Sequence, residues 1–152
     1  MPLRRLGRTD LQIPPLVFGG NVFGWTADKA TSFALLDRLA EAGLNAIDTA
    51  DIYSHWAPGN KGGESETIIG EWLKTSGKRG STTIITKCGA PSSPNKGLSA
   101  SAIAQSCEAS LKRLGVETID LYLSHFPDAA TPYEETLEAF ARLQKAGKVR
   151  WF

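Results

Sequence analysis

The sequence predicts an α/β fold in which parallel strands alternate with helices. Short runs of apolar or β-branched residues recur along the chain, at residues 16–18, 45–50, 82–88 and 119–125. Each run is followed by a longer segment whose apolar residues repeat at helical spacing, as at positions 33, 36, 39 and 40. Glycine closes three of these segments, at Gly43, Gly115 and Gly147. This alternation is typical of a parallel sheet covered by helices.

The chain is predicted to open with an antiparallel hairpin before the first buried strand. Residues 3–6 and 11–13 are short strand-like runs around the turn at residues 7–10, and Pro14-Pro15 end the hairpin. Residues 16–18 then form a buried strand that runs into Gly19-Gly20. Two glycines at a strand end either let a ligand approach the backbone or simply make a turn, and the residues alone leave both open.

Three helices are predicted after the first three buried strands. The first covers residues 28–42 and the second covers residues 64–74. The third is capped by Ser99 or Ser101, because a serine hydroxyl can accept a hydrogen bond from a free N–H of the first turn, and it ends near Leu114.

A fourth helix and the start of a fifth strand complete the predicted pattern. Thr131 is the expected N-cap, with Pro132 at the first helical position and Glu134 closing a capping box. After this helix, residues 148–152 have the composition of a strand.

Four strand–helix units and the opening of a fifth, joined by short connections, predict a (β/α)8 TIM barrel. A complete barrel takes about 250 residues, whereas this chain has 152. We therefore expect one partial domain over residues 1–152, made of the hairpin at residues 1–13 and an N-terminal half-barrel at residues 16–152. In such barrels the active site lies at the C-terminal ends of the strands.

Composition argues against several classes of protein. With 41% hydrophobic residues, 22% charged residues and a net charge of +1, the chain is expected to be globular and soluble. Its basic residues are scattered, which argues against a nucleic-acid partner, and an apolar run long enough to span a membrane is absent. The N-terminus lacks the apolar segment of a secretory signal, so we expect a cytoplasmic protein in which Cys88 and Cys107 stay reduced.

Four residues capable of chemistry stand at or just beyond predicted strand ends. Asp48 lies inside a buried strand, where an isolated carboxylate is costly and requires a cationic partner. Lys87 near the end of the next strand is the candidate cation, Tyr53 lies in the loop after Asp48, and His125 ends the fourth strand. Taken singly, each also fits an ordinary structural role, such as a turn cap, a rim aromatic, an exposed lysine or a core histidine. Because barrel strands end at one rim, we expect these four side chains to meet there.

The sequence predicts neither a phosphate-binding loop nor a metal site. The glycine-rich residues 59–63 lack the Gly-Lys-Ser/Thr ending of a phosphate loop, and Glu64 and Glu66 in the next helix would repel phosphate. We expect this loop to form a rim of the active site. Two histidines, His55 and His125, are too few for the usual metal site of a barrel hydrolase, so no metal ligands are predicted.

Four motifs make the chain resemble one known family, the aldo-keto reductases. Residues 47–53 (Ile-Asp-Thr-Ala-Asp-Ile-Tyr), with Gly-Glu-Ser-Glu at residues 63–66, look like the family segment that carries the catalytic aspartate and tyrosine. Residues 86–89 (Thr-Lys-Cys-Gly) are similar to the strand that carries its lysine, and residues 119–128 are similar to the strand that carries its histidine. Residues 146–150 also match, and the motifs occur in the family's order and spacing.

The resemblance implies a reductase that uses NADPH to convert small aldehydes or ketones to alcohols. The catalytic residues that it implies are Asp48, Tyr53, Lys87 and His125. In this scheme Tyr53 gives the proton, Lys87 stabilises the resulting phenolate while Asp48 holds Lys87, and His125 orients the carbonyl. The cofactor contacts that it implies are Gly20, Asn21 and Asp48.

Three aromatic residues follow predicted strand ends and are candidate walls of an apolar substrate pocket. They are Trp25, Trp56 and Phe126. Ordinary packing explains each of them equally well, so the pocket assignment depends on where the fold places them.

The resemblance covers the whole chain but stops where the family's second half begins. In the family that half carries most of the cofactor contacts, so we expect the 152-residue chain to be weakly active or inactive by itself. Its open sheet edges would be covered by a homodimer or by a C-terminal half supplied as another chain. Two rival functions stay open: a non-catalytic relic or regulatory half-barrel, and a lyase that forms a Schiff base through Lys87.

Overall fold

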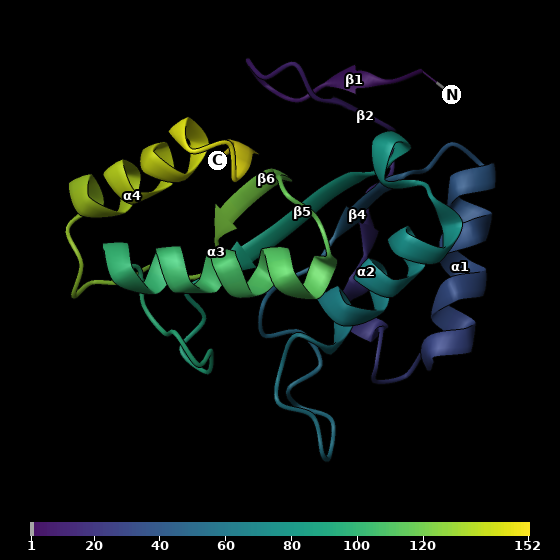
Figure 1. The fold of residues 1–152 in the computed structure, drawn as a ribbon, viewed down its shortest axis with the longest axis horizontal. Helices are drawn as coiled ribbons and strands as arrows, with labels where there is room; N and C mark the ends of the chain where they lie inside the picture. The colour runs from purple at the N-terminus through teal and green to yellow at the C-terminus, as the bar shows by residue number, and fades with distance from the viewer. Residues whose placement is uncertain (1) are drawn as a thin grey trace.

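The computed structural model describes residues 2–152. Its centre is a five-stranded parallel sheet in which each strand pairs with the next one in the chain (Figure 1). The strands are β3 (Phe18–Gly19), β4 (Ala46–Asp48), β5 (Thr83–Cys88), β6 (Ile119–Ser124) and β7 (Val149–Trp151). Parallel strands paired in chain order, with a helix in each connection, form the N-terminal part of a (β/α)8 barrel, as the sequence predicted.

One helix follows each of the first four strands of this sheet. The helices are α1 (Lys29–Glu41), α2 (Glu64–Ser76), α3 (Ala100–Leu114) and α4 (Tyr133–Lys145), with short 3-10 turns η1 (Gly20–Val22) and η2 (Arg79–Ser81) in the connections. Consecutive helices pack against one another, so together they form one layer along the sheet (Figure 1). Ser99, rather than Ser101, caps α3 by accepting a hydrogen bond from the backbone N–H of Ala102.

The main hydrophobic core lies between the helices and the sheet. Its fully buried side chains include Ile47, Ile84 and Tyr122 from the strands and Leu36, Trp72, Ile103 and Leu114 from the helices. Cys88 and Cys107 lie in this core as free thiols, and burial raises the pKa of each to about 12. Both therefore stay protonated and act as small apolar groups.

The N-terminal hairpin pairs β1 (Arg4–Arg5) with β2 (Gln12–Ile13) in the predicted antiparallel arrangement. It lies near the N-terminal ends of the barrel strands (Figure 1). Asp10 in its turn region accepts hydrogen bonds from Arg150 and from the indole N–H of Trp151, both in β7. The hairpin is thereby attached to the last strand of the sheet.

The predicted capping box of α4 is wrong. Pro132 occupies the N-cap position and no side chain caps this helix. The Thr131 hydroxyl instead donates to Asp128 Oδ2 at 2.7 Å, and the same oxygen accepts the backbone N–H of Leu98 at 2.8 Å. The loop before α4 is thus organised by a contact with the start of α3, which local sequence does not reveal.

Strand boundaries also differ from the prediction, most clearly in the first two strands of the sheet. The first barrel strand is Phe18–Gly19 rather than residues 16–18, and β4 is confined to Ala46–Asp48. Strand assignment follows the ladder with the neighbouring strand, and Phe18 pairs with Ile47 while Gly19 pairs with Asp48. The register therefore places Asp48 at the very end of its strand.

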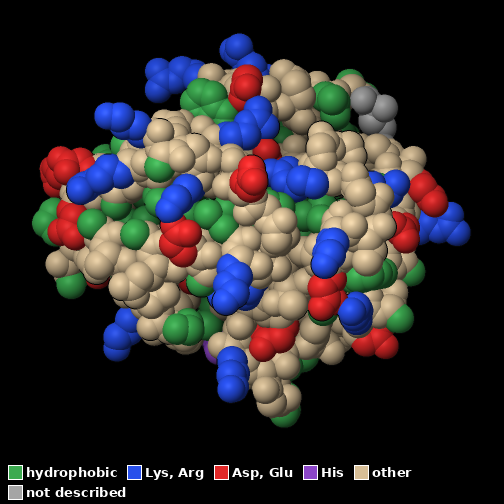
Figure 2. Space-filling view, in the orientation of Figure 1, with side chains coloured by type: hydrophobic (Ala, Val, Ile, Leu, Met, Phe, Trp, Pro, Cys, Tyr) green, Lys and Arg blue, Asp and Glu red, His purple; other side chains and the backbone are tan. Residues whose placement is uncertain are grey.

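Charged side chains of both signs are interspersed over the face shown in Figure 2. Among residues 2–152, no helix combines the length and the apolar character needed to cross a membrane.

Glu66 is a fully buried carboxylate that joins α2 to α3 and to β5. Its Oε2 accepts a hydrogen bond from Arg113 Nε at 2.6 Å, and its Oε1 accepts one from the Thr86 hydroxyl at 2.6 Å. The two helices approach so closely here that a Cβ on Gly70 would overlap the Arg113 carbonyl oxygen. The Glu66–Arg113 ion pair and the absence of a side chain on Gly70 together fix how α2 and α3 pack.

Asp51, just beyond β4, is a second buried carboxylate. Its side chain accepts the Ser93 hydroxyl, which lies 3.0 Å from each carboxylate oxygen. Burial raises the pKa of Asp51 to about 6, Glu66 adds to the rise, and the Ser93 hydrogen bond and Arg113 oppose it. Asp51 therefore binds its proton more tightly in the folded chain than in the unfolded chain.

Arg113→Met is expected to lower the free energy of unfolding by about 3–5 kcal/mol, because Glu66 would become an unpaired buried charge. Urea unfolding followed by circular dichroism measures the change. Arg38→Met is the matched control, since Arg38 and its partner Glu41 are both exposed, and it should cost less than about 1 kcal/mol. Similar losses in the two variants would contradict this account of Glu66.

The unsubstituted chain is expected to lose stability as the pH rises from about 4 to about 6, and Asp51→Asn is expected to abolish this loss. A raised pKa stabilises the fold while the group is protonated, and that contribution is lost as the pH rises through about 6. The shift of roughly two pKa units corresponds to about 3 kcal/mol. Urea unfolding of both proteins across this interval measures the difference, and a difference that does not grow with pH would disprove the raised pKa.

Candidate active site

The ends of β4 and β5 place a carboxylate and an ammonium on the same face of the sheet. Asp48 ends β4 and pairs in register with Ile85, so Lys87, two positions further along β5, points to the same side. Lys87 Nζ donates a hydrogen bond to Asp48 Oδ2 at 2.7 Å. Asp48 thus has the cationic partner that its position in the strand requires.

Lys87 uses all three protons of its ammonium group. Besides Asp48, Nζ donates to the Thr49 carbonyl oxygen at 2.7 Å and to the Tyr53 hydroxyl at 2.9 Å. The lysine side chain is 13% exposed, so protein atoms rather than water hold this cation. The Tyr53 hydroxyl therefore faces a positive charge, which stabilises the phenolate that remains when a tyrosine gives up its proton.

His125 lies beside Tyr53, with their ring centroids 5.7 Å apart. β6 ends one residue earlier, but His125 N–H donates to the Cys88 carbonyl oxygen at 2.8 Å and stays attached to the end of β5. Burial lowers the pKa of His125, the charge of Lys87 adds to this, and Asp48 opposes it, so the neutral imidazole is favoured. Within residues 2–152 its buried Nδ1 has no hydrogen-bond partner.

A cavity of about 360 Å³ opens in front of Tyr53 and His125. Its walls come from the segments that follow β4, β5 and β6: Ile52, Tyr53, His55, Trp56, Ala90, Pro91, Ser92, His125 and Phe126. Trp56 and Phe126, predicted as pocket walls, do line it, whereas Trp25 lies behind Trp56 in an edge-to-face contact at 5.7 Å. The cavity is therefore mostly aromatic and apolar around the Tyr53 hydroxyl.

Gly20 and Asn21, the other predicted cofactor residues, lie next to Asp48. Packing explains the glycine, whereas the asparagine is free to contact a ligand. A Cβ on Gly20 would lie 3.0 Å from Ser65 Oγ and 3.3 Å from the Asp48 carbonyl oxygen, so packing alone accounts for a glycine there. Asn21 is exposed, and its Oδ1 lies over Gly19, the register partner of Asp48. The Asn21 amide is thus the better placed of the two for a ligand.

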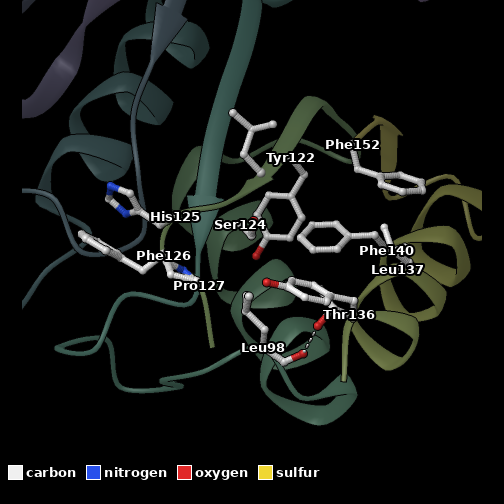
Figure 3. Close-up of a pocket in the computed structure, with 12 residues that line it drawn as sticks. Leu98, Tyr122, Ser124, His125, Phe126, Pro127, Thr136, Leu137, Phe140 and Phe152 are labelled. Carbon is white, nitrogen blue, oxygen red and sulfur yellow. Dashed lines mark hydrogen bonds between the residues drawn. The ribbon is translucent and has the colours of Figure 1, made fainter. Parts of the chain in front are cut away.

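A second cavity, of about 610 Å³, lies on the other side of His125 and Phe126 (Figure 3). Leu137 and Phe140 of α4 line it together with Phe152, and they gather on the side opposite the histidine. β7 pairs with only the first part of β6, as far as the Leu121–Trp151 pair. The cavity therefore lies where β6 continues without a partner on this edge.

The Tyr122 hydroxyl at the base of the second cavity has no hydrogen-bond partner within residues 2–152. The side chain is fully buried, and burial followed by the influence of the neighbouring Cys88 thiol raises its pKa well above the usual value. Figure 3 shows this hydroxyl on the side of Leu98 and Thr136. Tyr122 therefore stays a neutral phenol.

Several residues that shape the site carry no clear signal in the sequence. The Thr49 carbonyl completes the set of acceptors around Lys87, and Asp51 ties the segment before Tyr53 to Ser93. His55 and Ser92 line the cavity without having been singled out for that role. Asp51 lies in the same short motif as Asp48 and Tyr53, and a second acidic residue there was the available signal. In the described part of the chain, no group of three or more His, Cys, Asp or Glu side chains could hold a metal ion.

Two curated proteins are similar to this chain in sequence. The chain is 68% identical over 90 residues to an uncharacterized 11.2 kDa protein in the crtE 3′ region of Pseudescherichia vulneris, a match that covers 59% of this chain and 87% of that protein. It is 39% identical over 152 residues to the uncharacterized oxidoreductase YrpG of Bacillus subtilis, covering 95% of this chain and 46% of YrpG.

Among solved structures, the aldo-keto reductase AKR11C1 from Bacillus halodurans, in its holo form, superimposes with a TM-score of 0.85 at 32% identity. The match covers 99% of this chain and 49% of that one. This chain therefore spans about half the length of YrpG and of AKR11C1. The model of the aldo/keto reductase family matches residues 15–152, and the chain belongs to that family.

Proposed function

We propose that this chain supplies the acid–base centre of an NADPH-dependent reductase that converts aldehydes or ketones to alcohols. The observation that supports it is the Lys87 ammonium, which lies 2.9 Å from the Tyr53 hydroxyl and 2.7 Å from Asp48. A cation held in this position favours proton release from a phenol. The aldo/keto reductase family assignment makes an oxidoreductase reaction the expected use of that proton.

The nicotinamide, when bound, supplies a hydride to the carbonyl carbon, which no side chain can do. Tyr53 then gives its hydroxyl proton to the carbonyl oxygen, so that the carbon–oxygen double bond becomes an alcohol. Lys87 Nζ, 2.9 Å from the Tyr53 oxygen, stabilises the phenolate left behind, while Asp48 offsets part of that effect. Solvent returns a proton to Tyr53 after the product leaves.

His125 is assigned to orienting the substrate carbonyl. Its pKa is lowered by burial and by Lys87, so a neutral imidazole faces the cavity near neutral pH. A neutral imidazole can donate one hydrogen bond to the carbonyl oxygen without competing with Tyr53 for its proton.

The cavity in front of Tyr53 suits a small apolar carbonyl compound. Trp56 and Phe126 provide its aromatic walls, and no arginine or lysine lines it among the described residues. The exposed amide of Asn21 and the Asp48–Lys87 pair fit the nicotinamide end of NADPH. Charged contacts to the cofactor phosphates would come from elsewhere.

A Schiff-base lyase is less well supported than a reductase. An amine must be uncharged to attack a carbonyl carbon. Lys87 Nζ instead donates three hydrogen bonds, to Asp48, Thr49 and Tyr53. Its nitrogen therefore has no direction left from which to attack a substrate.

Activity of the whole reductase is proposed to need further strands at the open edge of β7. The described sheet has five strands in a fold that closes with eight. Two copies of this chain would bring ten strands, which is too many for that closure, so a C-terminal half with the remaining strands fits better than a homodimer. Exposed apolar side chains on α4, Tyr133 and Leu137, lie at the edge where such a half would pack.

Tyr53→Phe is expected to abolish NADPH-dependent carbonyl reduction by a reconstituted or full-length reductase, because the phenol acts in the transition state. Cofactor affinity should stay nearly unchanged. Steady-state kinetics and NADPH fluorescence titration measure the two quantities. Tyr133→Phe removes an exposed phenol hydroxyl and is the matched control. Comparable turnover by the Tyr53 and Tyr133 variants would exclude Tyr53 as the proton donor.

The 152-residue chain alone is expected to bind NADPH far more weakly than a complete reductase, by roughly a thousandfold if about 4 kcal/mol of contacts come from elsewhere. Adding the C-terminal half of AKR11C1 should give a one-to-one complex with restored binding, detected by sedimentation and NADPH fluorescence. Leu137→Glu on α4 should prevent the complex, and Ala104→Glu on α3, which is exposed but lies between α2 and α4 and away from both sheet edges, should not. Micromolar NADPH binding by the chain alone, or a stable homodimer, would refute this proposal.

A further inference from the structure

The segment that carries Tyr53 has no helix or strand to hold it. Residues 51–56 form successive turns after β4, in which Tyr53 N–H donates to Ala50 O at 3.2 Å and His55 N–H donates to Ile52 O at 3.1 Å. Turns of this kind leave several backbone directions open. The Tyr53 hydroxyl nevertheless lies within 2.9 Å of Lys87. Something outside the turns must fix the backbone on both sides of Tyr53.

On the N-terminal side, Asp51 ties the segment to β5 and to the loop after it. Its backbone N–H donates to the Lys87 carbonyl oxygen at 3.1 Å. Its carboxylate accepts the Ser93 hydroxyl, 3.0 Å from both oxygens, and both side chains are 5% exposed. Asp51 thus joins the tyrosine segment directly to the residue that Tyr53 must reach.

On the C-terminal side, Ser54 ties the segment to the loop after β3. Its hydroxyl is fully buried and donates to the Phe23 carbonyl oxygen at 2.6 Å. Its φ is +72°, and within residues 2–152 no other residue except glycine has a positive φ. A serine in this conformation carries strain that a glycine would avoid, and strain of this kind is kept where surrounding contacts enforce it.

We propose that Asp51 and Ser54 are positioning residues, which fix from both sides the backbone around Tyr53 so that its hydroxyl points at Lys87. The inference rests on the proposed function, in which that hydroxyl is the proton donor. The side-chain hydrogen bonds of Asp51 and Ser54 go to Ser93 and Phe23 rather than to the Tyr53 hydroxyl, so both act through the backbone. A misplacement of about 1 Å in a reacting group can cost on the order of a hundredfold in rate, which makes such anchoring valuable.

Because Ser54 is strained, two substitutions at this position can distinguish the anchoring role from an effect on stability alone. Ser54→Gly removes the hydroxyl and also relieves the positive φ, whereas Ser54→Ala removes the hydroxyl and keeps the strain. Stability therefore falls less in the glycine variant than in the alanine variant. The direction of the Tyr53 hydroxyl should be lost in both, because both lack the bond to Phe23.

The direct test follows the Tyr53 hydroxyl by NMR in the 152-residue chain labelled with ¹³C at tyrosine Cζ. The chain has three tyrosines, and Tyr53→Phe assigns the relevant resonance. Lys87→Met should move that resonance in the otherwise unchanged chain. We call the shift of the Tyr53 resonance caused by Lys87→Met the Lys87-dependent change. In chains that carry Ser54→Ala, Ser54→Gly or Asp51→Ala, this change should fall to less than about half of its value in the unsubstituted chain, as a lost coupling does in a double-mutant cycle.

Two variants act as rescue and control. Asp51→Asn keeps an oxygen that can accept the Ser93 hydroxyl and should keep most of the Lys87-dependent change. Ser99→Ala removes the cap of α3 and leaves the bonds of Asp51 and Ser54 in place, so it should lower stability without altering the Tyr53 resonance. If Asp51→Ala does not fold, Ser93→Ala breaks the same bond from the neighbouring loop and is expected to give the same result.

A full Lys87-dependent change in the Ser54→Ala and Ser93→Ala variants would overturn the proposal. An equal reduction in Ser99→Ala would also overturn it, because the effect would then follow general destabilisation. The result is distinguishable from failure of the proposed function. Reductase activity in Tyr53→Phe would remove the proton-donor role, whereas the NMR measurement would still show whether the hydroxyl is held.

Discussion

The Lys87 ammonium is the interaction on which the site depends. A lysine side chain that is 13% exposed keeps its charge at low cost only if protein atoms replace its hydration. Asp48, the Thr49 carbonyl and the Tyr53 hydroxyl provide those atoms, one for each proton of the ammonium. Because the three acceptors lie in one short segment that begins at the last residue of β4, satisfying the cation also fixes that segment against the end of β5.

The same strand is held from its other face by a second buried ion pair. Thr86 precedes Lys87 and points the opposite way, where its hydroxyl donates to Glu66. Glu66 is paired in turn with Arg113, and the two helices that carry these residues touch at Gly70. The position of Lys87 therefore depends on helix packing behind the sheet as well as on the acceptors in front of it.

Two buried polar atoms at the end of β6 have no hydrogen-bond partner among residues 2–152. His125 separates the cavity beside Tyr53 from the cavity beside α4 and keeps an unpartnered Nδ1. Tyr122 likewise keeps a buried hydroxyl without a partner. Unsatisfied buried polar atoms are rare in proteins, and both of these belong to residues that line the cavity where β6 continues beyond β7.

The sequence by itself determined the order of strands and helices, the hairpin, and the residues Asp48, Tyr53, Lys87 and His125 as candidates. It could do so because apolar periodicity is a local property and because a carboxylate in a buried strand demands a cation. Only the tertiary structure decided that Trp25 lies behind Trp56, that Thr131 bonds to Asp128 instead of capping α4, and that Asp51 and Ser54 hold the tyrosine segment. Most of these outcomes depend on contacts between segments far apart in the chain, as between Ser54 and Phe23, and such contacts leave no periodic trace in the sequence.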